Sequence, residues 1–217
     1  MKRTFFAVLL VLISLTLVGC GGGSSSPSTI TTQILSDPVY DGDISLNLTG
    51  TLTVTQGNTQ SVFAGIDPAT GTEFRAFLDF FLSGQGGVPS NAGIVSATLD
   101  IKIDSLRLLT QTDTIPILID LVSFQPPTLL STDFFNSNQP ALATIATSIF
   151  PTDLGQHVRI DVTSLMIEAQ RLNLPDFQVR ILEDTSIIGT PPGLFEINDT
   201  TGPNAAALAP LLEVTYF

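Results

Sequence analysis

Apolar and polar residues alternate along much of this chain, which is the pattern of β-strands with one buried face. The clearest case runs from Ile94 to Ser105, where from Val95 on the odd-numbered positions are apolar up to Ile103 and the even-numbered ones are Ser, Thr, Asp or Lys. Thr72–Leu82 alternates too, but Phe77 and Phe81 interrupt its polar face. We therefore expect both faces of that strand to be covered over part of its length.

Shorter runs of the same kind predict further strands, separated by segments rich in Gly, Pro, Asn and Asp. They are 44–55, 61–66, 115–124, 157–162, 177–183, 194–197 and 211–217. The first of these is one long strand or two, with Gly50 as a bend or bulge. One short helix is expected after Thr163 or Ser164, either of which can cap it, with Leu165, Met166, Ala169 and Leu172 on one face.

Residues 125–156 are the least regular stretch, and we expect a helical turn near 141–149 within them. Eight or nine strands and one short helix predict an all-β fold. The expected architecture is a two-sheet antiparallel β-sandwich, of the jelly-roll type, that forms a single domain over residues 30–217.

The first residues differ from this pattern. Lys2 and Arg3 precede an apolar run from Phe5 to Leu17, which is shorter than the about 18–20 residues of a membrane-spanning helix and suits a signal peptide. The next residues, Leu17-Val18-Gly19-Cys20, resemble the lipobox of bacterial lipoproteins. The resemblance implies that residues 1–19 are a cleaved signal peptide and that Cys20 becomes lipidated. An ordinary secretory signal with an incidental Cys is the alternative.

Residues 20–29 then follow as a Gly- and Ser-rich tether. Several acyl chains on one Cys hold a protein stably at a membrane, whereas a single chain does not. Gly21 stands directly after the Cys, and by resemblance to enterobacterial lipoproteins this favours the outer membrane. We expect an outer-membrane lipoprotein of the cell envelope, periplasmic or surface-exposed, whose body hangs from a lipid.

Charge and composition exclude several functions. The chain has 20 Asp and Glu against 8 Lys and Arg, a formal net charge of −12, so it lacks the basic surface of a general nucleic-acid binder. Its single Cys excludes an internal disulfide and a Cys-based zinc cluster. There is one His, His157, and no G-x-S-x-G motif. We expect no catalytic residues and no enzyme.

Two sets of residues are candidates for binding. Asp41 and Asp43, with Asp37 nearby, offer hard oxygen ligands for a structural calcium ion, although an Asp-Gly pair also simply makes a turn. No other cofactor is expected. A sugar platform needs exposed aromatic rings, and the chain has no Trp. Phe134, Phe135 and Tyr40 are the candidates, with burial under a loop or in the core as the alternative.

Four segments, taken in order, resemble the DNRLRE-type domain of bacteria and archaea. They are Phe74–Phe80, Ile94–Leu99, Asp161–Thr163 and Leu211–Tyr216. The resemblance implies a jelly-roll module of secreted and surface proteins, related in shape to carbohydrate-binding modules and accessory rather than catalytic. This chain lacks the Trp residues that family members carry, and its residues 125–156 have no counterpart there.

Together these observations predict a lipid-anchored, non-catalytic surface module of the cell envelope with a structural or adhesive role. Its expected partners are the membrane, through the lipid, and polysaccharide or other envelope proteins. The alternative function is a carbohydrate-binding module that holds polysaccharide at the cell surface.

Overall fold

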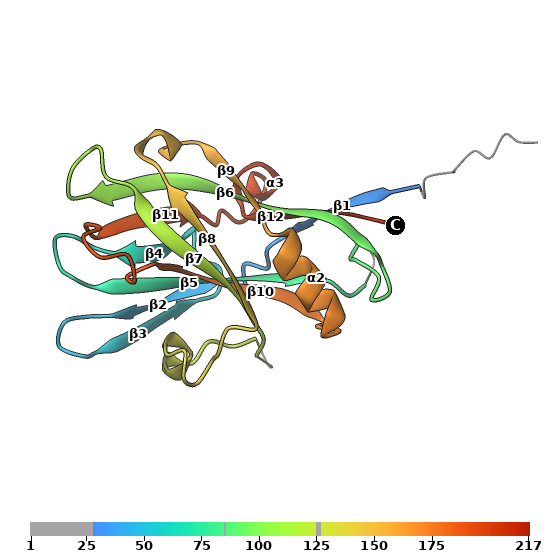
Figure 1. Cartoon of the computed structure of the whole chain (residues 1–217), viewed down its shortest axis with the longest axis horizontal. Coiled ribbons are helices and arrows are strands. Elements are labelled where there is room, and N and C mark those ends of the chain that lie inside the picture. Colours follow the sequence, from blue (N-terminus) through green and yellow to red (C-terminus); the bar gives the residue numbers. More distant parts are fainter. Residues whose placement is uncertain (1–27, 85, 125–126) are drawn as a thin grey trace, which may run out of the picture.

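The computed structural model describes residues 28–84, 86–124 and 127–217. These residues form a curled sheet in which every strand pairing is antiparallel (Figure 1). The strands are β1 (Ile30–Leu35), β2 (Gly42–Leu46), β3 (Leu52–Gln56), β4 (Ser61–Ile66), β5 (Glu73–Phe81), β6 (Ile94–Leu108), β7 (Ile115–Val122), β8 (Ala143–Ile149), β9 (His157–Asp161), β10 (Asp176–Glu183), β11 (Gly193–Asn198) and β12 (Leu211–Tyr216). The helices are α2 (Thr163–Arg171) and α3 (Ala205–Leu208), with 3-10 turns η1 (Ser131–Phe134) and η2 (Pro151–Asp153).

The sheet follows the order β1-β12-β6-β11-β4-β5-β10-β7-β8, with β2 and β3 continuing from β5 and β9 pairing with β6. The long strand β6 connects two parts of the sheet. The first half of β6 pairs with β12 and β9, and its second half pairs with β11. The mostly-β, antiparallel fold class expected from the alternating pattern is confirmed. None of the helices in the described residues is long and apolar enough to cross a membrane.

The main apolar core lies inside the curl of the sheet. The alternating residues of β6 from Ala97 to Ile103 are buried in it, as the pattern predicted. Helix α2 adds Leu165, Met166 and Ala169 to the same core, and this confirms the predicted helix. Thr163 does not cap α2 with its side chain; its Oγ1 accepts a hydrogen bond of 2.9 Å from the backbone N–H of Ala97 and so joins the helix to β6.

A second, smaller apolar cluster covers the other face of β5. Phe77 packs there with Ile44 of β2 and with Leu129 and Phe134 of the 127–142 loop, which runs between β7 and β8. The pattern of Phe77 and Phe81 predicted that both faces of β5 are covered over part of its length. This is confirmed at Phe77, which is buried, whereas Phe81 is exposed at the end of the strand.

The expected helical turn at 141–149 is wrong. Residues 143–149 form β8, which pairs with β7 from Leu121 opposite Ala143 to Ile115 opposite Ile149. The segment alternates half-buried and exposed residues, and its Thr and Ile side chains are β-branched, which suits a pleated edge strand. The turn occurs earlier, as η1. Gly50 lies between β2 and β3 with a φ of 83°, so residues 44–55 are two strands and not one.

Two arginines attach the 127–142 loop to the sheet. Arg180 is fully buried, forms an ion pair of 2.6 Å with Asp120 on the neighbouring strand β7, and donates to the carbonyl oxygen of Gln139 at 3.0 Å. Arg75 places its guanidinium 4.1 Å from the centre of the Phe134 ring, and it forms a salt bridge with Glu73 at 2.7 Å.

Replacing Arg180 tests this attachment. Arg180→Ala leaves the Asp120 carboxylate buried without its cation, so we expect the free energy of unfolding to fall by about 3–5 kcal/mol in urea denaturation. We also expect faster proteolysis within the 127–142 loop. Arg171→Ala is the control, since its ion pair with Glu168 is exposed and should not measurably affect stability. Equal stability of the two variants would contradict this account of the loop.

Candidate functional site

Four segments of the chain meet at one buried junction. The link between β1 and β2 joins the end of β5, where the N–H of Asp37 donates to the carbonyl oxygen of Asp79 at 2.8 Å. The same link joins the β3–β4 turn, where the N–H of Gly57 donates to the carbonyl oxygen of Asp41 at 3.1 Å. Asp199, directly after β11, donates its N–H to Gln60 in the residues before β4 at 2.9 Å.

Two acidic side chains from this junction, Asp41 and Asp199, are buried together, 0% and 1% exposed. Asp41 Oδ1 accepts the backbone N–H of Asp79 at 2.8 Å, and Asp199 Oδ2 accepts the hydroxyl of Thr59 at 3.3 Å. Their other oxygens, Asp41 Oδ2 and Asp199 Oδ1, have no hydrogen-bond donor among the described residues. Both carboxyl groups are therefore only half satisfied.

The two carboxyl groups interact with one another. Burial raises the pKa of Asp41 well above its usual range, and the charge of Asp199 raises it further. Burial also raises the pKa of Asp199 to about 6. No described Lys, Arg or His contributes an opposite charge to either pKa. This is an uncompensated pair of like groups, the least favourable way to bury an acid.

Three of the four unpartnered buried oxygens in the described residues belong to side chains that interact at this junction, Ser36, Asp41 and Asp199. The buried side-chain oxygens and nitrogens that lack a partner in the described part of the chain are Ser36 Oγ, Asp41 Oδ2, Asp79 Oδ1 and Asp199 Oδ1. The Ser36 hydroxyl is next to Asp41 and lowers the pKa of that carboxyl, but it makes no hydrogen bond of regular geometry there. Buried polar groups are almost always paired, so three together call for a physical cause.

Of the two aspartates that the sequence offered as metal ligands, Asp41 and Asp43, only Asp41 lies at the junction. Asp41 is at the junction, and Asp37 lies close enough for its charge to raise the pKa of Asp199. Asp43 is buried on β2, where burial raises its pKa to about 6, and its Oδ2 accepts the N–H of Phe63 at 3.2 Å. The structure thus places Asp41 beside Asp199, a residue that the sequence analysis did not name as a candidate ligand. Across residues 28–217, wherever placement is described, no group of three or more His, Cys, Asp or Glu is arranged to hold a metal.

The three rings predicted to form an aromatic platform do not lie together: Phe134 packs with Phe135, and Tyr40 packs with Phe81. Phe134 is only 2% exposed, under Arg75, so its ring offers no face to a ligand. Phe135 is 41% exposed and packs edge-on against Phe134, with the ring centres 5.4 Å apart. Tyr40 is half-buried and packs edge-on against Phe81 at 6.0 Å. Of the three, Phe135 has the greatest exposure.

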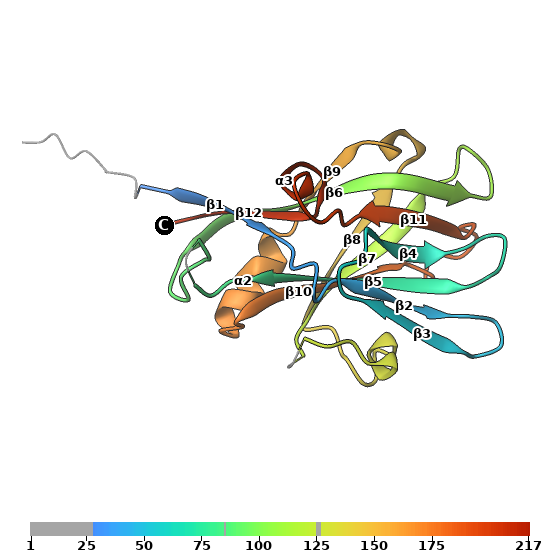
Figure 2. The same cartoon turned by 180° about the vertical axis from the view of Figure 1, so that it is seen from behind.

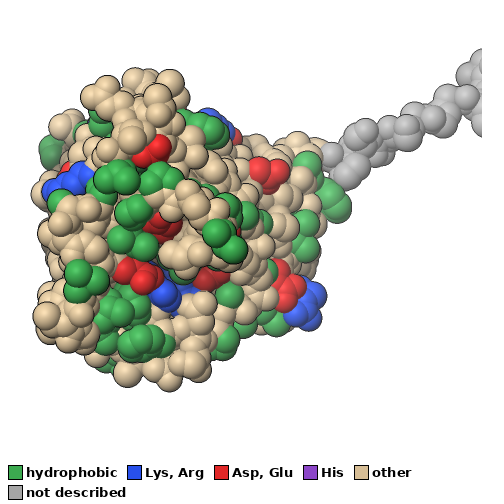
Figure 3. Space-filling model, turned by 60° about the vertical axis from the view of Figure 1, so that its left-hand side comes forward, with side chains coloured by type: hydrophobic (Ala, Val, Ile, Leu, Met, Phe, Trp, Pro, Cys, Tyr) green, Lys and Arg blue, Asp and Glu red, His purple; other side chains and the backbone are tan. Residues whose placement is uncertain are grey.

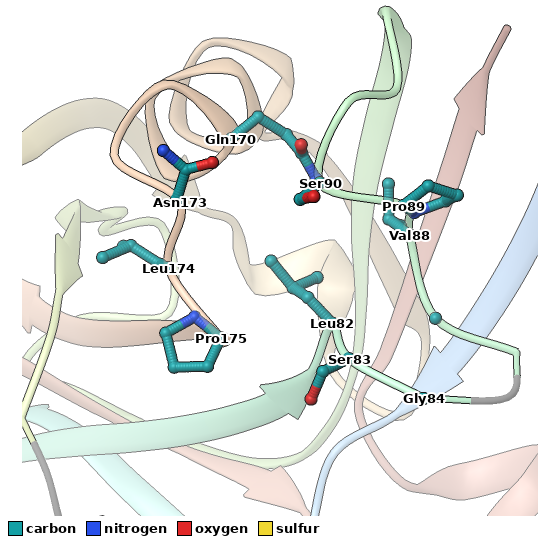
Figure 4. Close-up of a pocket in the computed structure, with 11 residues that line it drawn as sticks. Leu82, Ser83, Gly84, Val88, Pro89, Ser90, Gln170, Asn173, Leu174 and Pro175 are labelled. Atoms are coloured by element: carbon teal, nitrogen blue, oxygen red, sulfur yellow. The ribbon is translucent and has the colours of Figure 1, made fainter.

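A hollow of about 330 Å³ lies between the end of α2 and the loop that follows β5 (Figure 4). Figure 4 shows Gln170 and Ser90 side by side at its rim, opposite Leu82 and Pro175. Its lining is Leu82, Ser83, Gly84, Gly87, Val88, Pro89, Ser90, Gln170, Asn173, Leu174 and Pro175. This lining contains no titratable side chain and no aromatic ring, so it provides neither an acid–base pair nor a stacking surface for a sugar.

The lipobox residues, Leu17, Val18, Gly19 and Cys20, lie outside the described residues, as does most of the tether. Comparison with family models and with curated proteins finds no match for this chain. The resemblance to the DNRLRE-type domain therefore rests on its four segments and stays a prediction.

A further buried acid, Glu183 on β10, is separate from the junction. Its Oε2 accepts the N–H of Ile66 at 2.9 Å and the N–H of Gly193 at 3.3 Å. Burial raises its pKa to about 7. The folded protein thus holds this group protonated at a pH where the unfolded chain has already released the proton.

This shift makes stability depend on pH. The protonated Glu183 stabilises the fold fully below its unfolded pKa, and that contribution is lost as the pH rises through about 7. Glu183→Gln cannot ionise, so we expect its loss of stability between about pH 5 and pH 8 to be smaller than that of the wild type by about 2 kcal/mol, measured by urea denaturation. Glu168→Gln, at the surface, should behave like the wild type. Identical pH profiles for the wild type and Glu183→Gln would refute this role.

Proposed function

We propose that this chain is a lipid-anchored, non-catalytic surface module of a bacterial cell envelope, with a structural or adhesive role. The observation that carries the proposal is the order of its first segments: an apolar run ends at Leu17-Val18-Gly19-Cys20, and a Gly- and Ser-rich stretch then leads into a β-rich body. This order resembles that of a lipoprotein in which a folded domain is held at a distance from the membrane.

The arrangement of the body supports the same proposal. Strand β1, the first after the tether, lies at one end of the molecule beside the C-terminal strand β12 (Figures 1 and 2). The loops β2–β3, β4–β5, β6–β7 and β10–β11 lie together at the opposite end in both views. An anchor ahead of β1 would direct these four loops, here called the distal loops, away from the membrane.

The distal loops carry exposed apolar residues, which supports an adhesive role. Ile188 in the β10–β11 loop is 100% exposed, Leu48 in the β2–β3 loop is 81% exposed, and Leu109 at the end of β6 is exposed as well. Figure 3 turns this end forward and shows hydrophobic side chains interspersed with acidic ones. Exposed apolar groups on loop tips gain free energy when a partner covers them.

Removal of the lipid attachment site tests the anchor. Cys20→Ser should move the protein from the membrane fraction to the soluble envelope or medium fraction, because no acyl chain can then be attached. The measurement is an immunoblot of fractionated cells, with Ser24→Ala in the tether as the matched control. Retention of Cys20→Ser in the membrane fraction at the level of the control would overturn the proposed anchor.

A second candidate function, glycan binding, is favoured by one observation. The half-exposed ring of Phe135 is followed by Asn136 and Asn138, which are both exposed. A ring face beside carboxamides is the usual composition of a sugar-binding surface, in which the ring stacks and the amides form hydrogen bonds. This patch retains one of the three rings that the sequence predicted for a platform.

If this patch binds polysaccharide, Phe135→Ala should weaken the retention of the protein on an insoluble polysaccharide at least about 10-fold, since the stacking surface is removed. Phe150→Ala, which removes a ring of similar exposure in another loop, is the control. Depletion assays over a panel of polysaccharides provide the measurement. Binding that both variants retain equally would eliminate the patch.

A further inference from the structure

The buried junction has properties that the anchor and the distal loops do not explain. We propose that Asp41 and Asp199 bind one divalent cation between their carboxyl groups, that Ser36 contributes its hydroxyl oxygen, and that calcium is the ion that suits this set of ligands. The inference goes beyond the proposed function and does not depend on the lipid anchor.

The first argument is electrostatic. Two carboxyl groups buried against each other cannot both ionise unless a positive charge lies between them. The described Lys, Arg and His residues supply none to this pair, whereas Arg180 forms an ion pair with the buried Asp120. Either a shared proton or a bound cation must therefore neutralise the pair. A divalent ion would neutralise both groups at once.

The second argument comes from a neutral side chain. Ser36 is 5% exposed, and its hydroxyl oxygen lies beside Asp41 without a regular hydrogen bond to any described group. The hydroxyl lies close enough to Asp41 to lower the pKa of that carboxyl. A cation between the carboxyl groups provides a use for all three oxygens: Ser36 Oγ, Asp41 Oδ2 and Asp199 Oδ1.

The third argument concerns the kind of ion. All three ligands are oxygens, which favours a hard cation over zinc or copper. Two of them come from the link between β1 and β2 and the third from the residue after β11, and such irregular sets suit calcium, whereas magnesium demands near-ideal octahedral geometry. Backbone carbonyl oxygens and water would complete the shell. Two carboxylates without a third correspond to weak extracellular sites, with Kd on the order of 10⁻⁴–10⁻³ M.

The position of the ion would give it a structural effect. Asp41 and Ser36 lie on the link between β1 and β2, and Asp199 follows β11 on the other side of the junction. A bound cation would tie these two segments together. We therefore expect calcium to stabilise the folded protein without altering where it is located in the cell.

The test is the thermal unfolding of the purified mature protein after treatment with EDTA, with and without about 10 mM calcium or magnesium. For the wild type we expect calcium to raise Tm by about 3–8 °C, given the affinity above, and magnesium to raise it less. Asp199→Asn should lose most of this response. Glu183→Gln, which removes a buried acid outside the junction, should keep it.

Two further readouts separate the cation from a shared proton. Without calcium, Asp199→Asn should unfold at a higher temperature than the wild type, because the repulsion between the carboxyl groups is gone. Ser36→Ala should fold normally and show a reduced calcium response, and it serves as the test if the Asn variant does not fold. No calcium response in the wild type, or an undiminished response in both variants, would overturn the proposal. Neither outcome affects the lipid anchor, which fractionation of Cys20→Ser tests separately.

Discussion

The burial of Asp41 against Asp199 is the constraint around which the rest of the structure is arranged. The link from β1 to β2, the β3–β4 turn, the end of β5 and the end of β11 all make backbone hydrogen bonds at this junction. Each segment must adopt its position for the two carboxyl groups to meet. Burying two like groups is unfavourable until a proton or a cation neutralises them. The stability of the fold is therefore linked to the solution around it.

The buried carboxylate of Asp120 is neutralised in a different way. Asp120 pairs with Arg180 across β7 and β10, and the same arginine also bonds to the 127–142 loop. A chain with 20 acidic and only 8 basic residues cannot supply such a partner at every buried acid. For Asp41 and Asp199, the cation proposed above would supply the missing positive charge.

How far the fold could be predicted depended on how local its signals are. Strand β6 and helix α2 were predicted because their buried residues recur with a fixed period within one segment. Strand β1 was missed because it is a polar edge strand, whose partner β12 lies at the far end of the sequence. The alternation in β8 is weak, because Ala143 and Ala146 stand on opposite faces, so the sequence does not distinguish a strand from a helical turn there.

The candidate site was harder to predict, because its residues come together only in the folded protein. Asp41 attracted attention through its neighbours in sequence, but its partner Asp199 lies near the other end of the chain and has no diagnostic spacing. Similarly, nothing in the sequence indicates that Arg75 lies over Phe134 and removes that ring from the surface. Contacts of this kind depend on sheet order, which a periodic pattern does not specify.

Whether the junction holds an ion can be measured most directly by equilibrium dialysis of the purified mature protein against radioactive calcium. The account predicts one calcium ion per chain at saturation in the wild type, and a loss of that ion in Asp41→Asn. Wild-type protein that binds no more calcium than Asp41→Asn at every concentration would contradict it.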